Sequence, residues 1–229
     1  MDDWYDVAIV GYGSVGQTLA ILLGQRGWKV GVFEKQPVPV LDTYASERIP
    51  QVRQVVELSI ELGKVICVPD RVAAAARDAA MIAAAKDRGP TPPLPTPAIG
   101  PGVLVDGDPC AGHLFIQGEV RRGKATGLFD DVVGRGFTLL SPVGDPARRL
   151  APDLAAFFAS LGGLSAQVAP GGPVEDVLGT YARWFAHHGV GVVLQRPDFH
   201  VFGTAPRIGG ADALVGGLRR ALELTRPAK

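Results

Sequence analysis

Short apolar runs and glycines alternate over the first forty residues. Residues 7–10 form a four-residue apolar run of the kind that becomes a buried parallel strand. Apolar positions then recur at helical spacing from Gly16 until Gly27, and residues 29–33 read as a second strand. This order predicts a β-α-β unit with a glycine-rich turn between the first strand and the helix.

Two longer helical patterns follow. The first begins near Asp42 or Thr43 and continues to Gly63, and we expect Glu47 and Arg48 on its first turns to face solvent. A strand-like run at 65–68 precedes an alanine-rich helix over 71–87. A proline-rich stretch over 89–102 then predicts an extended connector, for which the alternative is a ligand for SH3-type domains.

The remaining residues alternate between strand and helix patterns. We predict strands at 112–119, 136–140, 165–168, 190–194 and 199–203, and helices at 152–161, 174–188 and 211–224. A βαβ half followed by a hairpin and a closing helix is the thioredoxin-like arrangement. The predicted fold class is therefore α/β, with a β-α-β fragment of a Rossmann-like domain (1–40), a helical segment (41–88), the connector (89–102) and a thioredoxin-like C-terminal domain (103–229).

Composition narrows the choice of function. The 23 basic and 23 acidic side chains cancel and form no basic block, which argues against a nucleic-acid partner. The acidic start and the lack of a long apolar run predict no leader, no membrane span and a cytoplasmic location.

Cys67 and Cys110 lie far apart without a CxxC motif, so we expect neither thiol exchange nor a metal site. His187 and His188 close a predicted helix, where a cation suits the dipole, and no catalytic residue can be assigned.

The glycine turn is the stretch that specifies a chemistry. Gly11 permits a tight turn, Gly13 lets the backbone approach a pyrophosphate, and Gly16 allows helix and strand to touch. The phosphates would lie on the helix N-terminus, and Glu34, which ends the second strand, would accept hydrogen bonds from a ribose diol. An acidic residue there favours FAD or NAD over NADP. The predicted cofactor-binding residues are Gly11, Gly13, Ser14, Val15, Gly16, Glu34 and Lys35.

Together these features resemble the single-component FAD-dependent aromatic hydroxylases, most closely the 3-(3-hydroxyphenyl)propionate hydroxylase type. One block of resemblance covers residues 5–39, where the three motif glycines and Glu34 match the positions that hold the ADP half of FAD. The second runs from Leu41-Asp42-Thr43-Tyr44 through Glu47 and Arg48 to the C-terminus. The resemblance implies FAD as cofactor, NADH or NADPH as co-substrate, and hydroxylation of a phenolic acid.

The two blocks meet near residues 39–41, where the family has a long middle segment. That segment carries the flavin-ring and substrate regions, so we expect this polypeptide alone to hydroxylate poorly or not at all. One alternative is a non-catalytic interaction module that forms homo-oligomers through its thioredoxin-like domain. Another is a small NAD-binding reductase, which would need a complete sheet and a catalytic acid or base.

Overall fold

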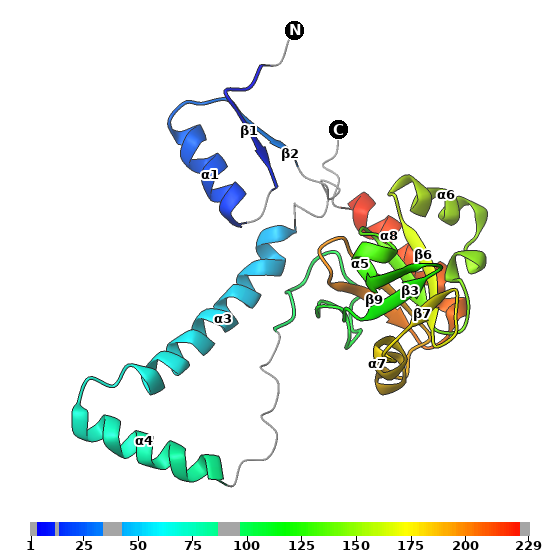
Figure 1. Cartoon of the computed structure of the whole chain (residues 1–229). Helices are drawn as coiled ribbons and strands as arrows, with labels where there is room; N and C mark the ends of the chain where they lie inside the picture. The colour runs from blue at the N-terminus through cyan, green and yellow to red at the C-terminus, as the bar shows by residue number, and fades with distance from the viewer. Residues whose placement is uncertain (1–3, 12–13, 34–42, 87–96, 225–229) are drawn as a thin grey trace.

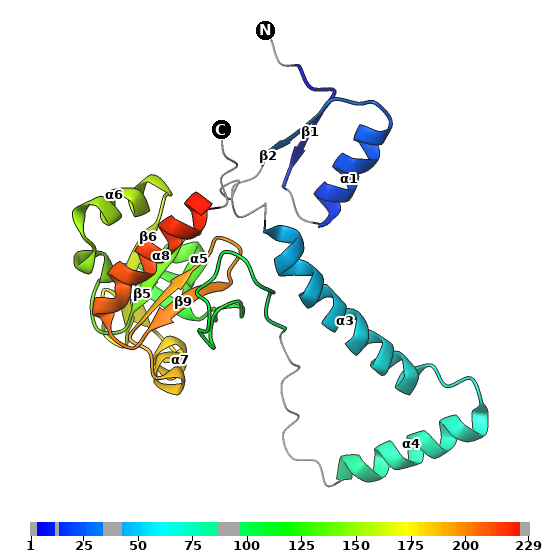
Figure 2. The same ribbon diagram turned by 180° about the vertical axis from the view of Figure 1, so that it is seen from behind.

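The computed structural model describes residues 4–11, 14–33, 43–86 and 97–224. Three parts follow one another along the chain: a small N-terminal β-α-β unit, a pair of long helices, and a C-terminal domain built on a seven-stranded sheet (Figure 1). The helix pair projects away from the C-terminal domain, and the N-terminal unit stands beside that domain rather than within it (Figures 1 and 2).

The N-terminal unit has the predicted elements. Strand β1 (Val7–Val10), helix α1 (Ser14–Gln25) and strand β2 (Val30–Phe33) follow in order, and the strands pair in parallel, with Val7 opposite Val30. The Tyr5 ring packs directly on Gly31. A Cβ atom added to Gly31 would lie 2.9 Å from the Tyr5 Cγ atom. A parallel sheet needs cover on both faces, and Tyr5 supplies part of that cover.

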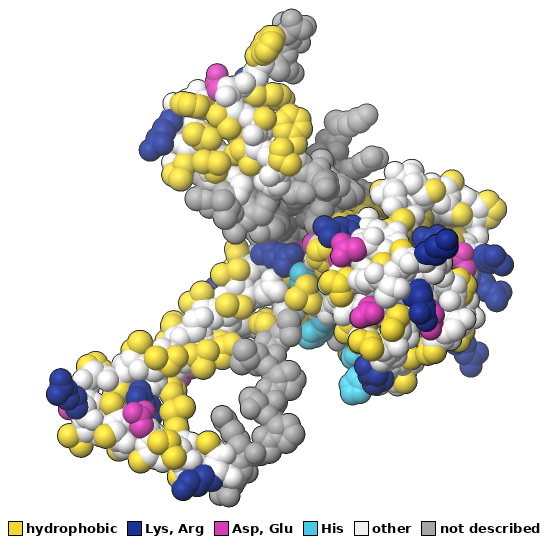
Figure 3. Space-filling view, viewed as in Figure 1, with side chains coloured by type: hydrophobic (Ala, Val, Ile, Leu, Met, Phe, Trp, Pro, Cys, Tyr) yellow, Lys and Arg dark blue, Asp and Glu magenta, His cyan; other side chains and the backbone are white. Residues whose placement is uncertain are grey.

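The helical segment consists of α3 (Tyr44–Ile66) and α4 (Arg71–Lys86). The strand predicted at 65–68 is wrong, because Val65 and Ile66 continue α3 beyond Gly63. Arg77 of α4 stabilises this end of α3 by donating to the Val65 carbonyl at 2.5 Å and the Ile66 carbonyl at 3.2 Å. Apolar side chains cover much of the outer surface of both helices (Figure 3), and α4 has no buried residue.

The C-terminal domain has one sheet with the strand order β4-β3-β7-β6-β5-β8-β9. Strands β5, β6 and β7 are mutually parallel, whereas β8 runs antiparallel to both β5 and β9. A second antiparallel hairpin, β3-β4, extends the sheet beyond β7. The strands are β3 (Glu119–Arg122), β4 (Ala125–Leu128), β5 (Thr138–Ser141), β6 (Leu164–Ala169), β7 (Val174–Asp176), β8 (Val192–Gln195) and β9 (Val201–Ala205).

Two apolar clusters form the core, one on each face of this sheet. Helices α6 (Pro152–Ser160) and α8 (Ala211–Leu224) pack against Leu139 and Leu194 on one face (Figure 2). Helices α5 (Phe129–Val132) and α7 (Thr180–His188) cover Leu140 and Val193 on the other. Alternating side chains of the central strands thus reach opposite clusters, as strand geometry requires. The βαβ unit, hairpin and closing helix predicted for this region are confirmed as elements.

Two predicted elements of this domain need correction. The helix expected over 174–188 begins only at Thr180, because residues 174–176 form β7 beside β6. Asp176 ends that strand and accepts hydrogen bonds from the Thr180 and Ala182 amides, 2.9 Å each, which starts α7. The strand expected over 112–119 is mostly irregular, with a single bridge between Leu114 and His200. The β3-β4 hairpin was not predicted.

Candidate functional site

The glycine turn lies where both N-terminal strands end. β1 stops at Val10, Gly11 takes a left-handed conformation with φ +98°, and α1 begins at Ser14 and Val15. The Gly11 amide donates to the Phe33 carbonyl at 2.8 Å. This bond brings the turn beside the carboxyl end of β2, next to which Glu34 follows in sequence.

Close packing explains why glycine occupies position 16. A Cβ atom added there would lie 2.1 Å from the Gly11 carbonyl oxygen and 3.4 Å from the Ile9 Cγ2 atom. Helix α1 therefore begins in contact with the turn. The N–H groups of its first turn have no partner within the helix, and they lie, with the positive end of the helix dipole, at the edge of the sheet where β1 and β2 end. This cradle suits the diphosphate of a dinucleotide. Gly13, Glu34 and Lys35, the other predicted contacts, lie outside the described residues.

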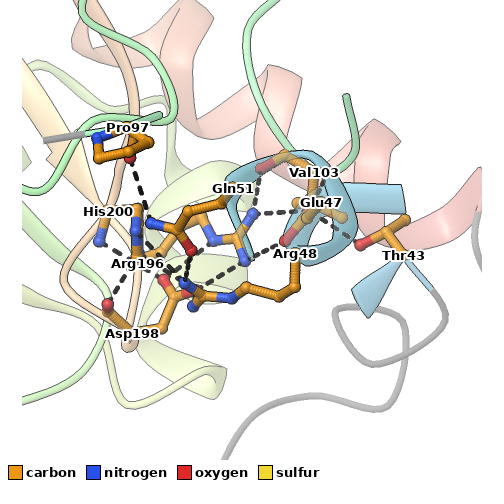
Figure 4. Close-up of polar contacts among 9 residues, drawn as sticks. All are labelled: Thr43, Glu47, Arg48, Gln51, Pro97, Val103, Arg196, Asp198 and His200. Atoms are coloured by element: carbon orange, nitrogen blue, oxygen red, sulfur yellow. Dashed lines mark hydrogen bonds and ion pairs between the residues drawn. The ribbon is translucent and has the colours of Figure 1, made fainter. Parts of the chain in front are cut away.

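A second polar site, which the sequence did not predict, joins α3 to the C-terminal domain (Figure 4). Glu47 and Arg196 form a bidentate ion pair, with Nη1 to Oε1 at 2.8 Å and Nη2 to Oε2 at 2.7 Å. Each side chain is only 1% exposed. Glu47 also accepts from the Val103 amide at 2.8 Å and the Thr43 hydroxyl at 2.9 Å, so its carboxylate is fully hydrogen-bonded. The expectation that Glu47 faces solvent is wrong.

Asp198 connects this pair to a second arginine. Its carboxylate accepts from Arg196 at 2.9 Å and from Arg48 at 2.9 Å, so two carboxylates and two guanidinium groups balance in charge. His200 Nδ1 lies 2.9 Å from the Asp198 carbonyl and 3.5 Å from its Oδ2 atom. Burial by itself raises the pKa of Asp198, but the His200 hydrogen bond and the Arg196 charge outweigh it and hold that pKa well below its usual range.

Backbone contacts complete this attachment. The Gly100 amide donates to the Glu47 carbonyl at 2.7 Å, and the Gln51 side-chain amide donates to the Pro97 carbonyl at 3.1 Å. We call Glu47, Arg48, Gln51, Arg196, Asp198 and His200 the helix latch. Its polar groups bond to one another and to nearby groups such as the Val103 amide and the Pro97 carbonyl, which suits a structural joint between α3 and the domain rather than chemistry on a ligand.

One cysteine and one histidine lie close together in the C-terminal domain. Cys110 Sγ lies 3.4 Å from His188 Nδ1, while burial raises the pKa of the Cys110 thiol and lowers that of the His188 imidazole, which favours the neutral form of both. Cys67 is exposed and Cys110 is buried, and both are free thiols. Over the residues that the structure describes, no three His, Cys, Asp or Glu side chains are grouped so that they could hold a metal ion.

Sequence comparison places the chain among known proteins. Residues 112–220 match the HcaD C-terminal domain family. The chain is 36% identical over 184 residues to a probable NADH-specific resorcinol 4-hydroxylase of Rhodococcus jostii, covering 78% of this chain and 34% of that protein. It is 28% identical over 216 residues to 3-(3-hydroxy-phenyl)propionate/3-hydroxycinnamic acid hydroxylase 2 of Burkholderia vietnamiensis, covering 82% and 40%. The chain thus spans little more than a third of the length of such relatives.

Solved structures share its fold. The flavin-dependent monooxygenase PieE, solved with FAD and substrate, superposes with a TM-score of 0.57 at 24% identity, over 88% of this chain and 42% of that one. Aklavinone-11 hydroxylase, solved with FAD and aklavinone, superposes with a TM-score of 0.53 at 22% identity, over 91% of this chain and 38% of that one.

Among the helices of the described residues, none is both long enough and apolar enough to cross a bilayer.

Proposed function

Because this chain is related by sequence to the FAD-dependent aromatic hydroxylases and carries their HcaD-type C-terminal domain, we propose that it is a shortened hydroxylase of this kind. The proposed role is to hold the ADP part of FAD at the glycine turn. The observation that carries this is the 36% identity over 78% of the chain to a resorcinol hydroxylase. A turn in which only glycine fits at position 16 supports it independently.

Each part of the chain has a proposed task. The amides at the start of α1 would bind the diphosphate, Gly11 and Gly16 would keep the approach open, and Glu34 with Lys35 would meet the ribose. The flavin, when bound, would supply the oxygen chemistry, with NADH as reductant and a phenolic compound as substrate, as the names of the relatives suggest. We propose a thioredoxin-like domain over 103–229 that is attached to this apparatus through the helix latch.

Flavin retention tests this proposal. The purified chain is incubated with excess FAD, free ligand is removed, and the visible absorption spectrum is recorded. Near-stoichiometric flavin bands would support a working site, and NADH oxidation stimulated by resorcinol or 3-(3-hydroxyphenyl)propionate would then test turnover. A colourless protein, with no flavin retained, would contradict the proposed cofactor role.

A second candidate function is an interaction module, and the exposed apolar surface of α3 favours it. Val52, Val55, Leu62 and Ile66 recur at alternating spacings of three and four residues around Ser59, and each is between 46% and 72% exposed. Such a stripe is typical of a helix that packs against another helix. Association measured by light scattering at several concentrations, and its loss in a Val52→Glu/Leu62→Glu variant, would support this function. A monomer at every concentration would contradict homo-oligomerisation.

A further inference from the structure

A hollow of about 740 Å³ opens on the C-terminal domain, far in sequence from the glycine turn. Its walls come from the loop after β5, the 3-10 turn η1 (Pro146–Arg149), strand β6, the end of β3 and the 3-10 turn η2 (Ile208–Gly210). The polar lining residues are Arg122, Asp145, Arg148, Arg149, Ser165 and Gln167. Its volume falls within the range of small-molecule sites, roughly 300–1,000 Å³.

The topology of the sheet places this hollow where α/β sheets commonly bind ligands. After β5 the chain moves first to β6 and β7 on one side and later to β8 and β9 on the other, so the strand order reverses at β5. Val143, Gly144 and Asp145 lie just after the carboxyl end of β5, and Ile208 lies just after the end of β9. In open sheets, the crevice outside the carboxyl ends of the strands at such a reversal is the usual binding position.

The charges of the lining are unbalanced. Three arginines line the hollow, and among its described lining residues Asp145 is the only acidic one. The Asp145 Oδ1 atom already accepts from the Ser165 hydroxyl at 2.6 Å and from the Ala147 amide at 3.1 Å. Within the described part of the chain, no ion pair joins Arg122, Arg148 or Arg149 to a carboxylate. Other arginines of the domain do form ion pairs, as Arg121 does with Glu175 and Arg135 with Asp131.

We propose that this hollow is a binding site for a small ligand that carries oxyanion groups, either phosphate or carboxylate. Planar guanidinium groups donate paired hydrogen bonds to both kinds of group. Arg148 and Arg149 lie on η1 at one wall, while Arg122 ends β3, next to Arg121, which is opposite Glu175 of β7. Positive charge therefore reaches the hollow from separate elements, and a ligand with more than one anionic group suits this arrangement.

Nuclear magnetic resonance on the full chain, labelled with nitrogen-15, tests the proposal. Sodium pyrophosphate and sodium citrate are titrated separately while sodium chloride keeps the ionic strength constant, because unspecific charge effects follow ionic strength. We expect saturable shifts of the Gly144, Ser165 and Gln167 amides. Tighter binding of pyrophosphate would identify a phosphate ligand, and tighter binding of citrate a carboxylate ligand. Shifts near Gly16 report the glycine turn separately.

Variants make the test specific. Arg148→Gln/Arg149→Gln removes two of the three guanidinium groups and should weaken binding on the order of tenfold or more. Arg135→Gln is the matched control, because Arg135 is exposed, pairs with Asp131 and does not line the hollow. Both variants change exposed side chains, and the dispersion of the amide spectrum verifies their folding. Shifts that never saturate, or that are equal in the double variant and the control, would overturn the proposal.

Discussion

At the scale of single residues, the helix latch is the strongest constraint in the structure. Glu47 and Arg196 are separated by 149 positions in sequence and are almost completely buried together. Taking two charges out of water is costly, and their mutual attraction offsets that cost only when hydrogen bonding is complete. Here the carboxylate and guanidinium groups have partners on every side, so removal of one partner leaves the other buried and uncompensated.

Arg196→Met should therefore be strongly destabilising. We expect the free energy of unfolding to fall by about 3–5 kcal/mol, the range for breaking a buried pair from one side. Arg121→Met is the matched control, since Arg121 pairs with Glu175 at the surface and such pairs contribute below about 1 kcal/mol. Urea denaturation followed by circular dichroism measures both. Equal losses in the two variants would show that the latch contributes no more than a surface pair.

The low pKa of Asp198 should make the free energy of unfolding depend on pH in the acid range. Its pKa is lower in the folded chain than in the unfolded chain, so the unfolded state binds the proton more readily and the contribution is lost as pH falls below about 4. At neutral pH that contribution is fully present. Asp198→Asn should flatten the fall in unfolding free energy between about pH 4 and about pH 2. If denaturation midpoints of the variant and the parent chain fell in parallel over this range, the low pKa would be refuted.

At the scale of elements, local patterns predicted most helices and strands and the pairing of neighbouring ones, but not the contacts between residues far apart in sequence. The β-α-β unit, α6, α8 and the β8-β9 hairpin follow from apolar periodicity and turn residues. The pattern failed at residues 174–188, because Val174 and Leu178 also have helical spacing, and only pairing with β6 and β3 makes 174–176 a strand. The latch could not be predicted, since nothing near Glu47 indicates an arginine 149 positions away.

The glycine turn gives the clearest test at this scale. Gly16→Ala places a Cβ 2.1 Å from the Gly11 carbonyl oxygen, so the turn must shift. Gly24→Ala is the matched control in the same helix, because its added Cβ would meet no atom within 4 Å apart from the adjacent residues and the backbone of its own helix, and alanine favours a helix by about 1 kcal/mol over glycine. We expect Gly16→Ala, but not Gly24→Ala, to speed hydrogen exchange of the Gly11 amide, which donates a hydrogen bond to the Phe33 carbonyl. Only Gly16→Ala should also weaken FAD retention. Equal effects of both substitutions would contradict this role.

At the scale of the whole molecule, the parts differ in how much packing supports them. All four residues of β5 are buried in the centre of the sheet, and so are those of β8. By contrast, β1 and β2 form a two-stranded sheet in which Val10 is 82% and Phe33 52% exposed. Two paired strands with little cover are marginally stable in water. The N-terminal unit should therefore open without unfolding of the C-terminal domain.

Hydrogen exchange resolved by mass spectrometry measures this difference. We expect peptides from β1 and β2 to exchange at least about 100-fold faster than those from β5 and β8, because local opening needs less free energy where few apolar groups are buried. Saturating FAD should slow exchange at β1, β2 and the start of α1 while leaving β5 unchanged, since a ligand stabilises the unit that it binds. Uniform protection across the chain would mean that the N-terminal unit shares the stability of the domain. Slowing confined to β5 would instead place the flavin site away from the glycine turn.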